Sequence, residues 1–156
     1  MGCHEDHIKI AVVICQKRHH TRLVYENKDD ESYMNLCPGI VVDSRGQENS
    51  ITSASNIEFY LNSHVGIQGT CKASKYSLIY DTIGLSLSDI ELITYWSTYL
   101  YGRVNRCVSV ATPAYYAHWL SKRGRHLLAA GATTIDLHNI SNTWSIGTKI
   151  NPMYFI

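Results

Sequence analysis

Short apolar stretches separated by polar turns predict a group of strands in the first half of the chain. Residues 8–15 (IKIAVVIC) form a β-branched apolar run without alternation, which is typical of a central strand buried on both faces of its sheet. Residues 57–64 (IEFYLNSH) alternate between apolar and polar positions, as strands do. The two other predicted strands lie in residues 38–43 (PGIVVD) and 75–81 (KYSLIYD). Residues 26–37 and 45–56 are polar and rich in turn-forming residues, so we predict loops there.

Two helices are predicted in the second half of the chain. Residues 86–101 carry Ser88 and Glu91 at the spacing of a capping box, together with an apolar stripe. The stripe consists of Ile90, Ile93, Trp96 and Leu100. Residues 112–131 begin with Thr112, which we expect to be the N-cap of the second helix. Strands followed by helices, without internal repeats, indicate an α/β or α+β domain.

Length and composition favour a single globular domain. The 156 residues are 45% apolar and 17% charged, which suits a chain that buries a core. The formal net charge is only +1, so a basic surface must come from local clustering of charges. Five scattered cysteines without a CxxC pair suggest reduced thiols. Since the chain shows no signal peptide and no apolar stretch of membrane-spanning length, we expect a cytoplasmic or nuclear protein without a membrane partner.

The densest basic cluster follows the first predicted strand. Its members are Lys17, Arg18, His19, His20 and Arg22. Ligands often bind at strand ends in α/β sheets, and these side chains suit phosphate contacts, although a solvated loop is the alternative for any charged run. A zinc site is a further alternative on ligand type, but its spacing matches no zinc motif. Its candidate ligands are Cys3, His4, His7, Cys15 and the pair His19 and His20.

Two further features could contact a ligand. The second predicted helix carries a basic surface that could hold phosphates, or a metal through a histidine, unless it is simply a solvated face. Its members are His118, Lys122, Arg123, Arg125 and His126. In residues 63–70 (SHVGIQGT), Gly66 and Gly69 would let the backbone approach a ligand closely, although a plain β-turn explains them as well.

Eight stretches of the chain, taken in order, form a set with a known counterpart. They are QKRHHTR (16–22), PGIVVD (38–43), EFYLNSHVGIQGT (58–70), KYSLIYD (75–81), ELITY (91–95), RVNRCVSVATPAYYAH (103–118), RGR (123–125) and the terminal MYF (153–155). The set resembles the C-terminal half of the PIWI domain in the Argonaute/Piwi family. The resemblance implies an α/β, ribonuclease H-like fold that is partial here, with a mixed sheet and flanking helices. Residues 1–156 are then one partial domain with a core match over 8–130, a divergent loop over 131–152 and a docked tail over 153–156.

The resemblance implies that the chain comes from an RNA-silencing protein that carries a small guide RNA and pairs it with a target RNA. In slicing relatives, two Mg²⁺ or Mn²⁺ ions held by three acidic residues and a final Asp or His cleave the target. The resemblance places that final position on His118, as catalytic residue and metal ligand. The acidic members precede the strand that begins at Ile8, so we expect this chain alone to hold no cofactor and not to cleave RNA.

For this chain's own residues, the resemblance implies contacts with the phosphate backbone of the guide. These contacts fall on Lys17, Arg18, His64, Tyr101, Arg103, Ser109 and Tyr115. Arg123 would contact the guide 5′-phosphate, while Gln68 and Lys72 would lie next to the same channel. Such groups bind phosphates and read no base edges, so sequence specificity would come from guide pairing. His19, His20 and Arg22 are expected to be structural residues.

Two other functions stay open. The chain could be part of a Mg²⁺-dependent endoribonuclease (slicer) if a parent protein supplies the missing carboxylates. It could instead be a protein-interaction module whose aromatic pocket takes tryptophan-containing partners. The aromatic residues concerned are Tyr95, Trp96, Tyr99 and Trp119. Aromatic residues at helical spacing more often belong to a core, which is the alternative for this group.

Overall fold

The computed structural model describes residues 8–29, 32–43 and 57–131, without the side chains of 127–131. One compact unit ends at Thr112 and a second begins at Pro113, and each is described by itself. Several expectations lie outside the described residues: the loop 45–56, the segment that follows Gly131, the tail 153–156, and Cys3, His4 and His7 of the zinc hypothesis. No helix of the described part is long and apolar enough to cross a membrane.

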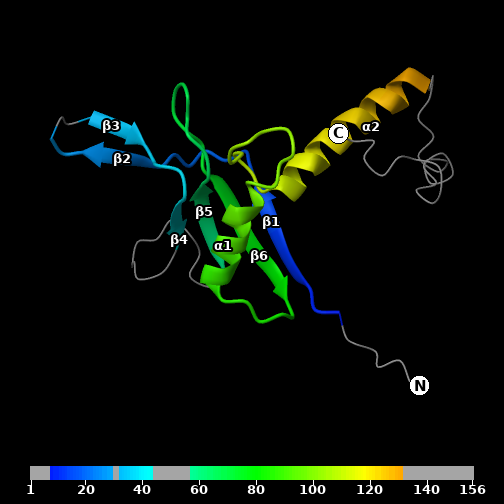
Figure 1. Cartoon of the computed structure of the whole chain (residues 1–156), viewed down its shortest axis with the longest axis horizontal. Helices are drawn as coiled ribbons and strands as arrows, with labels where there is room; N and C mark the ends of the chain where they lie inside the picture. Colours follow the sequence, from blue (N-terminus) through cyan, green and yellow to red (C-terminus); the bar gives the residue numbers. More distant parts are fainter. Residues whose placement is uncertain (1–7, 30–31, 44–56, 132–156) are drawn as a thin grey trace. The chain divides into compact units, whose positions relative to one another are not determined.

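Four strands of the first unit form an antiparallel sheet in the order β1-β6-β5-β4 (Figure 1). They are β1 (Ala11–Gln16), β4 (Ile40–Asp43), β5 (Glu58–Asn62) and β6 (Ser74–Asp81). All four coincide with strands predicted from the apolar pattern. Phe59 and Leu61 of β5 point to one face, and Tyr60 points to the other, as strand geometry requires.

A separate hairpin replaces the loop that the sequence predicts over residues 26–37. Its strands are β2 (Val24–Asn27) and β3 (Ser32–Asn35), and Tyr25 pairs with Met34 (Figure 1). The loop prediction was wrong because the charged residues between the strands dominate the composition of the segment. Each strand is only four residues long and contains a tyrosine, which favours extended backbone.

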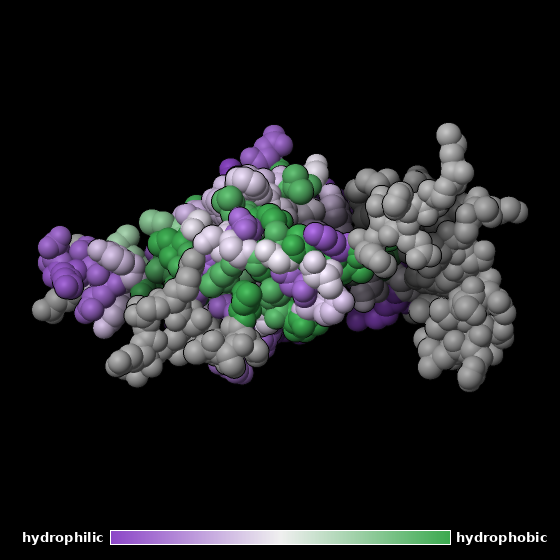
Figure 2. Space-filling model, turned by 90° about the horizontal axis from the view of Figure 1, so that it is seen from below, coloured by the Kyte–Doolittle hydropathy of each residue, from purple (hydrophilic) through white to green (hydrophobic). Residues whose placement is uncertain are grey.

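The position of β1 also differs from the prediction. A central strand buried on both faces was expected, but among the described residues β1 pairs only with β6 and lies at the edge of the sheet. The side chain of Ile14 is therefore 50% exposed, and Ile10 and Val12 are exposed as well. Figure 2 shows hydrophobic side chains gathered on the face of this unit that is seen from below. An uninterrupted apolar run thus marks a strand here without marking burial.

The first helix, α1 (Leu87–Ser97), has its N-cap at Ser86, two residues before the N-cap predicted from the sequence. The hydroxyl of Ser86 accepts a hydrogen bond from the backbone N–H of Asp89, whose carboxylate accepts one from the backbone N–H of Ser86. The capping box is therefore Ser86 with Asp89, and the assignment to Ser88 and Glu91 was wrong. Aspartate serves at the third helical position here in place of the glutamate that the motif usually carries.

The core lies between α1 and one face of the sheet (Figure 1). Its fully buried members are Phe59, Leu61, Tyr76 and Ile90. The rings of Phe59 and Tyr76 stack with centroids 5.3 Å apart, and the Tyr76 hydroxyl accepts a hydrogen bond from the backbone N–H of Ala111 at 2.9 Å. This bond fixes the segment that leads into the second helix against the sheet.

The buried row of α1 is not the one that its apolar residues predict. Ile90 is buried as expected, but it continues into Thr94 and Thr98, which are also buried. Trp96 is 59% exposed and Leu100 is 71% exposed. The predicted stripe is therefore wrong beyond Ile90. Residues spaced four apart share a helix face, and Thr94 and Thr98 continue the buried row that Ile90 begins.

The second helix, α2 (Thr112–Gly131), has the bounds that the sequence predicts. The Thr112 hydroxyl has no hydrogen-bond partner within the described residues, so the expected N-cap bond is not formed. Apart from its first residue, the helix belongs to the second unit. Its exposed side chains include most of the cationic residues of that unit.

Candidate nucleic-acid interface

The basic cluster after β1 separates into exposed cations and structural residues. Lys17 and Arg18 are exposed. His19 donates from Nε2 to the carbonyl oxygen of Ala73 at 2.7 Å, and its ring meets the ring of Tyr60 edge-on with centroids 5.3 Å apart. These contacts attach the chain after β1 to the start of β6 and to β5.

Arg22 also serves the backbone of this segment. Its Nη1 donates to the carbonyl oxygens of His19 and Thr21, both at 2.9 Å. The structural roles expected for His19 and Arg22 are confirmed, whereas His20 is exposed. The contacts hold the segment in shape and leave Lys17 and Arg18 at the surface beside it.

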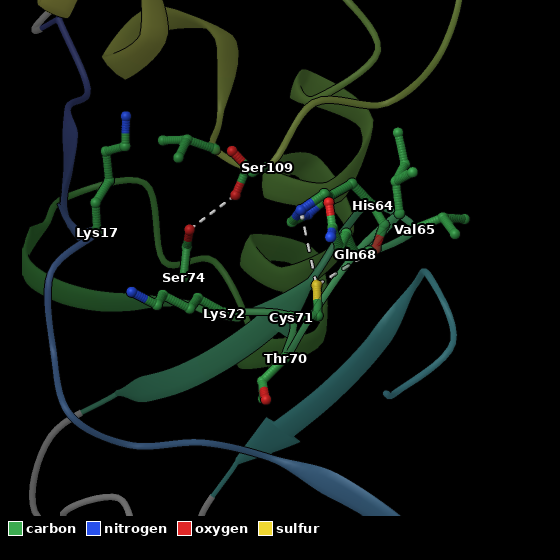
Figure 3. A pocket seen from close by; sticks show the side chains of 12 residues that line it. Lys17, His64, Val65, Gln68, Thr70, Cys71, Lys72, Ser74 and Ser109 are labelled. Atoms are coloured by element: carbon green, nitrogen blue, oxygen red, sulfur yellow. Dashed lines mark hydrogen bonds between the residues drawn. The ribbon is translucent and has the colours of Figure 1, made fainter. Parts of the chain in front are cut away.

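A pocket of about 500 Å³ is lined by Lys17 and gathers residues from three separate segments of the first unit (Figure 3). Its lining consists of Lys17, His64, Val65, Gly66, Ile67, Gln68, Thr70, Cys71, Lys72, Ser74, Ser109 and Val110. Five of these are residues predicted from the sequence to bind nucleic acid: Lys17, His64, Gln68, Lys72 and Ser109. In Figure 3, Lys17 and Lys72 lie on one side of this Lys17 pocket, and His64 and Gln68 lie on the other.

The loop between β5 and β6 forms much of the pocket wall, and Asn35 at the end of β3 holds it. Asn35 donates from Nδ2 to the carbonyl oxygen of Gly69 at 2.8 Å, and its Oδ1 accepts from the backbone N–H of Cys71 at 2.7 Å. A Cβ on Gly66 would lie 3.2 Å from Asn35 Nδ2, so this glycine allows close packing against protein atoms. Gly69 has φ +71°, which favours glycine in the turn.

Asn62, a buried residue at the end of β5, holds the same loop against the sheet. The Cys71 thiol donates to Oδ1 of Asn62 at 3.0 Å, and Nδ2 of Asn62 donates to the carbonyl oxygen of Leu36 at 2.7 Å. Burial raises the pKa of the Cys71 thiol, so the thiol stays protonated and keeps its role as donor. Asn62 is almost fully buried, and its amide is satisfied on both sides.

His64 contributes a neutral imidazole to the pocket. Its Nε2 lies 3.7 Å from the Cys71 sulfur, and its Nδ1 is buried without a hydrogen-bond partner among the described residues. Desolvation lowers the pKa of His64, so the ring is uncharged at neutral pH. Lys17 and Lys72 are therefore the side chains that give this pocket positive charge.

Cys71 and Ser74 also line the pocket, but no motif in the sequence predicts a role for them there. The Ser74 hydroxyl donates to the carbonyl oxygen of Ser109 at 2.8 Å, which joins the start of β6 to the segment before α2 (Figure 3). The Ser63 hydroxyl donates to the neighbouring carbonyl oxygen of Val108 at 2.6 Å. No local pattern in the sequence signals these two serine contacts, because each joins residues more than thirty positions apart.

The other expected nucleic-acid residues do not line the Lys17 pocket. Arg18 and Arg103 are exposed, and Tyr101 is buried. Tyr115, His118 and Arg123 belong to α2 in the second unit.

Tyr95 and Tyr99 of the aromatic group lie together, with hydroxyl oxygens 2.7 Å apart, and the nearby Trp96 is exposed. Binding of a tryptophan-containing partner there stays a prediction.

A second pocket lies on α2 and contains His118. The described residues that line it are His118, Ser121, Lys122 and Arg125. No group of three His, Cys, Asp or Glu side chains in the described part of the chain could hold a metal ion. Two cations and a hydroxyl around one imidazole do not suit a divalent metal, which requires carboxylate or other oxygen ligands. A metal role for His118 therefore depends on ligands that the described residues do not supply.

Comparisons with known proteins show the family to which the chain belongs. A family model for the Piwi domain matches residues 3–129, and the chain belongs to the Piwi domain family. Protein argonaute PNH1 from Oryza sativa subsp. japonica is 36% identical over 148 residues, which cover 92% of this chain and 15% of that relative. The chain thus spans about a seventh of the length of this curated relative.

Solved structures give the same result. The C-terminal lobe of a budding yeast Argonaute matches with a TM-score of 0.64 at 27% identity, over 81% of this chain and 27% of that one. Kluyveromyces polysporus Argonaute with a guide RNA matches with a TM-score of 0.61 at 26% identity, over 81% of this chain and 15% of that one. The ribonuclease H-like α/β class and the resemblance to the Argonaute/Piwi family are confirmed.

Proposed function

We propose that this chain is the part of an Argonaute-like RNA-silencing protein that holds the phosphate backbone of a small guide RNA. The observation that carries the proposal is the Lys17 pocket, which collects five side chains expected to contact nucleic acid. The match to an Argonaute structure with a guide RNA supports the choice of ligand. A target RNA would enter by pairing with the guide, in the cytoplasm or the nucleus.

The pocket chemistry suits a phosphodiester chain. The ammonium groups of Lys17 and Lys72 neutralise phosphates and release counterions, which makes binding dependent on salt. The Gln68 amide and the Thr70 hydroxyl add neutral hydrogen-bond donors. None of these groups is arranged to read base edges in a duplex groove, so binding does not depend on sequence. Specificity then comes from base pairing between guide and target.

Fluorescence anisotropy with a labelled 12-nucleotide single-stranded RNA tests the proposal. The Lys17→Ala/Lys72→Ala variant is expected to bind about 10-fold more weakly than the unmodified chain at low salt, because two phosphate contacts are lost. The slope of log affinity against log salt should decrease in magnitude by about 1.4, or about 0.7 per contact on a single strand. Circular dichroism confirms that both proteins are folded.

Lys9→Ala/Lys28→Ala is the matched control, because it removes the same charge from exposed positions outside the pocket. We expect it to change the affinity less than two-fold, since only long-range electrostatics is altered. Equal losses in the two double variants would show that net charge, rather than the Lys17 pocket, determines binding. RNA binding that does not respond to salt would contradict phosphate recognition itself.

Cleavage is not part of the proposed function of this chain alone. A slicing relative needs carboxylates to hold its divalent ions, and these would come from another part of a longer protein. Incubation of the chain with 5′-labelled RNA and Mg²⁺ or Mn²⁺ is expected to leave the RNA intact on a denaturing gel. Metal-dependent cleavage that disappears in the His118→Ala variant would show that the chain is part of a complete endoribonuclease site.

A further inference from the structure

The β2–β3 hairpin is a two-stranded sheet that presents most of its side chains to solvent. Within the described part of the chain, its two strands pair only with each other. The outer edge of each strand therefore offers backbone N–H and C=O groups that the ladder does not use. Tyr25 is 60% exposed and Tyr33 is 71% exposed. A hairpin of this size is marginally stable in water, and Asn35 anchors its base to Gly69 and Cys71.

The register of the hairpin sorts its exposed side chains into two faces of different chemistry. Glu26 is the cross-strand partner of Tyr33, and Tyr25 is the partner of Met34. Directly opposed residues of an antiparallel pair project to the same face, with Cβ atoms about 4.5–5.5 Å apart. One face therefore combines a carboxylate with an aromatic ring. The other face combines an aromatic ring with a thioether, and all four side chains are exposed.

The charge of the hairpin is opposite to that of the Lys17 pocket. In the sequence, residues 24–35 contain four acidic residues and one lysine. The side chains of Glu26 and Asp29 are exposed. Such a surface repels a polyanion, so the hairpin does not extend the surface proposed to hold the guide RNA. It attracts a cationic partner instead, and charge complementarity of this kind steers association between proteins.

The pair of Glu26 and Tyr33 suits the side chain of an arginine or a lysine. A carboxylate accepts two parallel hydrogen bonds from a guanidinium, and the face of a tyrosine ring attracts the same cation. The face formed by Tyr25 and Met34 offers apolar contacts instead. Successive residues of an added strand point to opposite faces. A partner strand in which cations alternate with apolar residues would therefore match both faces of the hairpin at once.

We propose that the β2–β3 hairpin is a docking site for an extended basic segment of a protein partner, in which arginine or lysine alternates with apolar residues. The segment adds to a free edge of the hairpin as a third strand, and main-chain hydrogen bonds hold it there. Its cations lie beside Glu26 and Tyr33, and its apolar side chains lie beside Tyr25 and Met34. A third strand also stabilises the hairpin, which has only two strands of its own.

An octapeptide of alternating arginine and valine tests the proposal. Titration of the isotopically labelled chain is expected to give saturable shifts of the backbone amide resonances in residues 24–27 and 32–34. An octapeptide with all its arginines before all its valines keeps the charge and composition but loses the alternation. It is expected to bind about 5-fold more weakly, since cations and apolar side chains then meet the wrong faces. Equal affinity for the two peptides, or no saturable shift in the hairpin, would overturn the proposal.

Two matched pairs of variants locate the contacts. Glu26→Gln is expected to weaken binding of the alternating peptide about 5-fold, whereas Asp29→Asn, which removes the same charge just beyond β2, should change it less than two-fold. Tyr33→Phe keeps the aromatic ring and should also bind within two-fold, whereas Tyr33→Leu should bind about 3-fold more weakly. The amide spectra show that the hairpin is formed in each variant. Equal effects of Glu26→Gln and Asp29→Asn would show that net charge alone attracts the peptide, and the proposal would fail.

The same spectra distinguish a basic peptide from other occupants of the hairpin. Lys17→Ala/Lys72→Ala should leave peptide binding unchanged, because those residues line the Lys17 pocket and belong to the proposed binding of guide RNA. Saturable shifts in residues 24–27 and 32–34 on addition of single-stranded RNA would assign the hairpin to the nucleic-acid interface. Shifts that grow with the concentration of the chain alone would identify a second copy as the occupant. Either result would overturn the proposal.

Discussion

The side-chain oxygen of Asn35 accepts a hydrogen bond from the backbone N–H of Cys71 at 2.7 Å, which links the β2–β3 hairpin to the wall of the Lys17 pocket. The amide of the same side chain donates to the carbonyl oxygen of Gly69. One residue at the end of β3 thus fixes both the turn and the start of the segment that carries Lys72. Removal of the two bonds should loosen the loop and thereby weaken the pocket.

Asn35→Ala is expected to lower the free energy of unfolding by about 1–3 kcal/mol, because two backbone groups lose their partner. Hydrogen exchange of the backbone amides in residues 66–72 should accelerate, and RNA affinity should fall with it. Asn35→Asp keeps the acceptor for Cys71 and loses the donor for Gly69, so an intermediate effect is expected. Unchanged exchange in residues 66–72 of the alanine variant would contradict the role assigned to Asn35.

The cap of α1 gives a second prediction with a matched pair of serines. Ser86→Ala removes the side-chain acceptor for the Asp89 N–H and is expected to cost about 1 kcal/mol in the free energy of unfolding. Ser88→Ala lies inside the first turn, where alanine is a better helix former, and should cost less. Urea denaturation of both variants measures the difference. A larger cost for Ser88→Ala would favour the capping box first expected from the sequence.

The strands and helices of the fold were largely predictable, because each is encoded by local periodicity and turn residues. Apart from the β2–β3 hairpin and the cap of α1, the errors concern strand pairing and burial. The apolar run of β1 predicts a strand, but the sequence contains no information on how many neighbours that strand has. The exposed Trp96 and the buried Thr94 on α1 show the same limit, because the buried face of a helix depends on the packing of the sheet beneath it.

The residues of the candidate site were also predictable only in part. The resemblance to the Argonaute/Piwi family predicted five lining residues of the Lys17 pocket, which lie after β1, between β5 and β6, and before α2. Asn35, Cys71 and Ser74 were not selected, because their roles arise from contacts between distant segments. Their residue types are common in loops and strand ends, and only the folded chain distinguishes them.

The buried phenol of Tyr76 should make the chain sensitive to alkali. Burial raises the pKa of Tyr76 above the value of about 10 that the unfolded chain would show. The folded state therefore favours the neutral phenol, so this contribution to stability is complete below about pH 10 and is lost as the pH rises above it. The free energy of unfolding should fall with a slope of up to about 1.4 kcal/mol per pH unit from this group.

Urea denaturation between pH 9 and pH 11 measures the slope. Tyr76→Phe removes the titrating group and also the acceptor for the Ala111 N–H, so it should cost about 1–2 kcal/mol at pH 8 and show a smaller loss in alkali. Tyr80→Phe is the control, because that side chain is 54% exposed and should have little effect on either quantity. A steep alkaline loss that persists in Tyr76→Phe would point to other groups.

His64 should cause a loss of stability on the acid side. Desolvation lowers its pKa below the value of about 6.5 expected in the unfolded chain. The unfolded state therefore binds the proton more readily, so this contribution is complete above about pH 6.5 and is lost as the pH falls toward the lower folded value. The free energy of unfolding of the unmodified chain should then decrease between pH 7 and pH 5.

Substitution of His64 separates this effect from the titration of carboxylates at lower pH. His64→Gln keeps a polar side chain in the pocket and should remove the decrease between pH 7 and pH 5. His20→Gln, at an exposed position outside the pocket, should leave it in place. Thermal unfolding followed by circular dichroism at intervals of half a pH unit resolves the two behaviours. A decrease of equal size in both variants would show that His64 is not the group that couples stability to pH in this range.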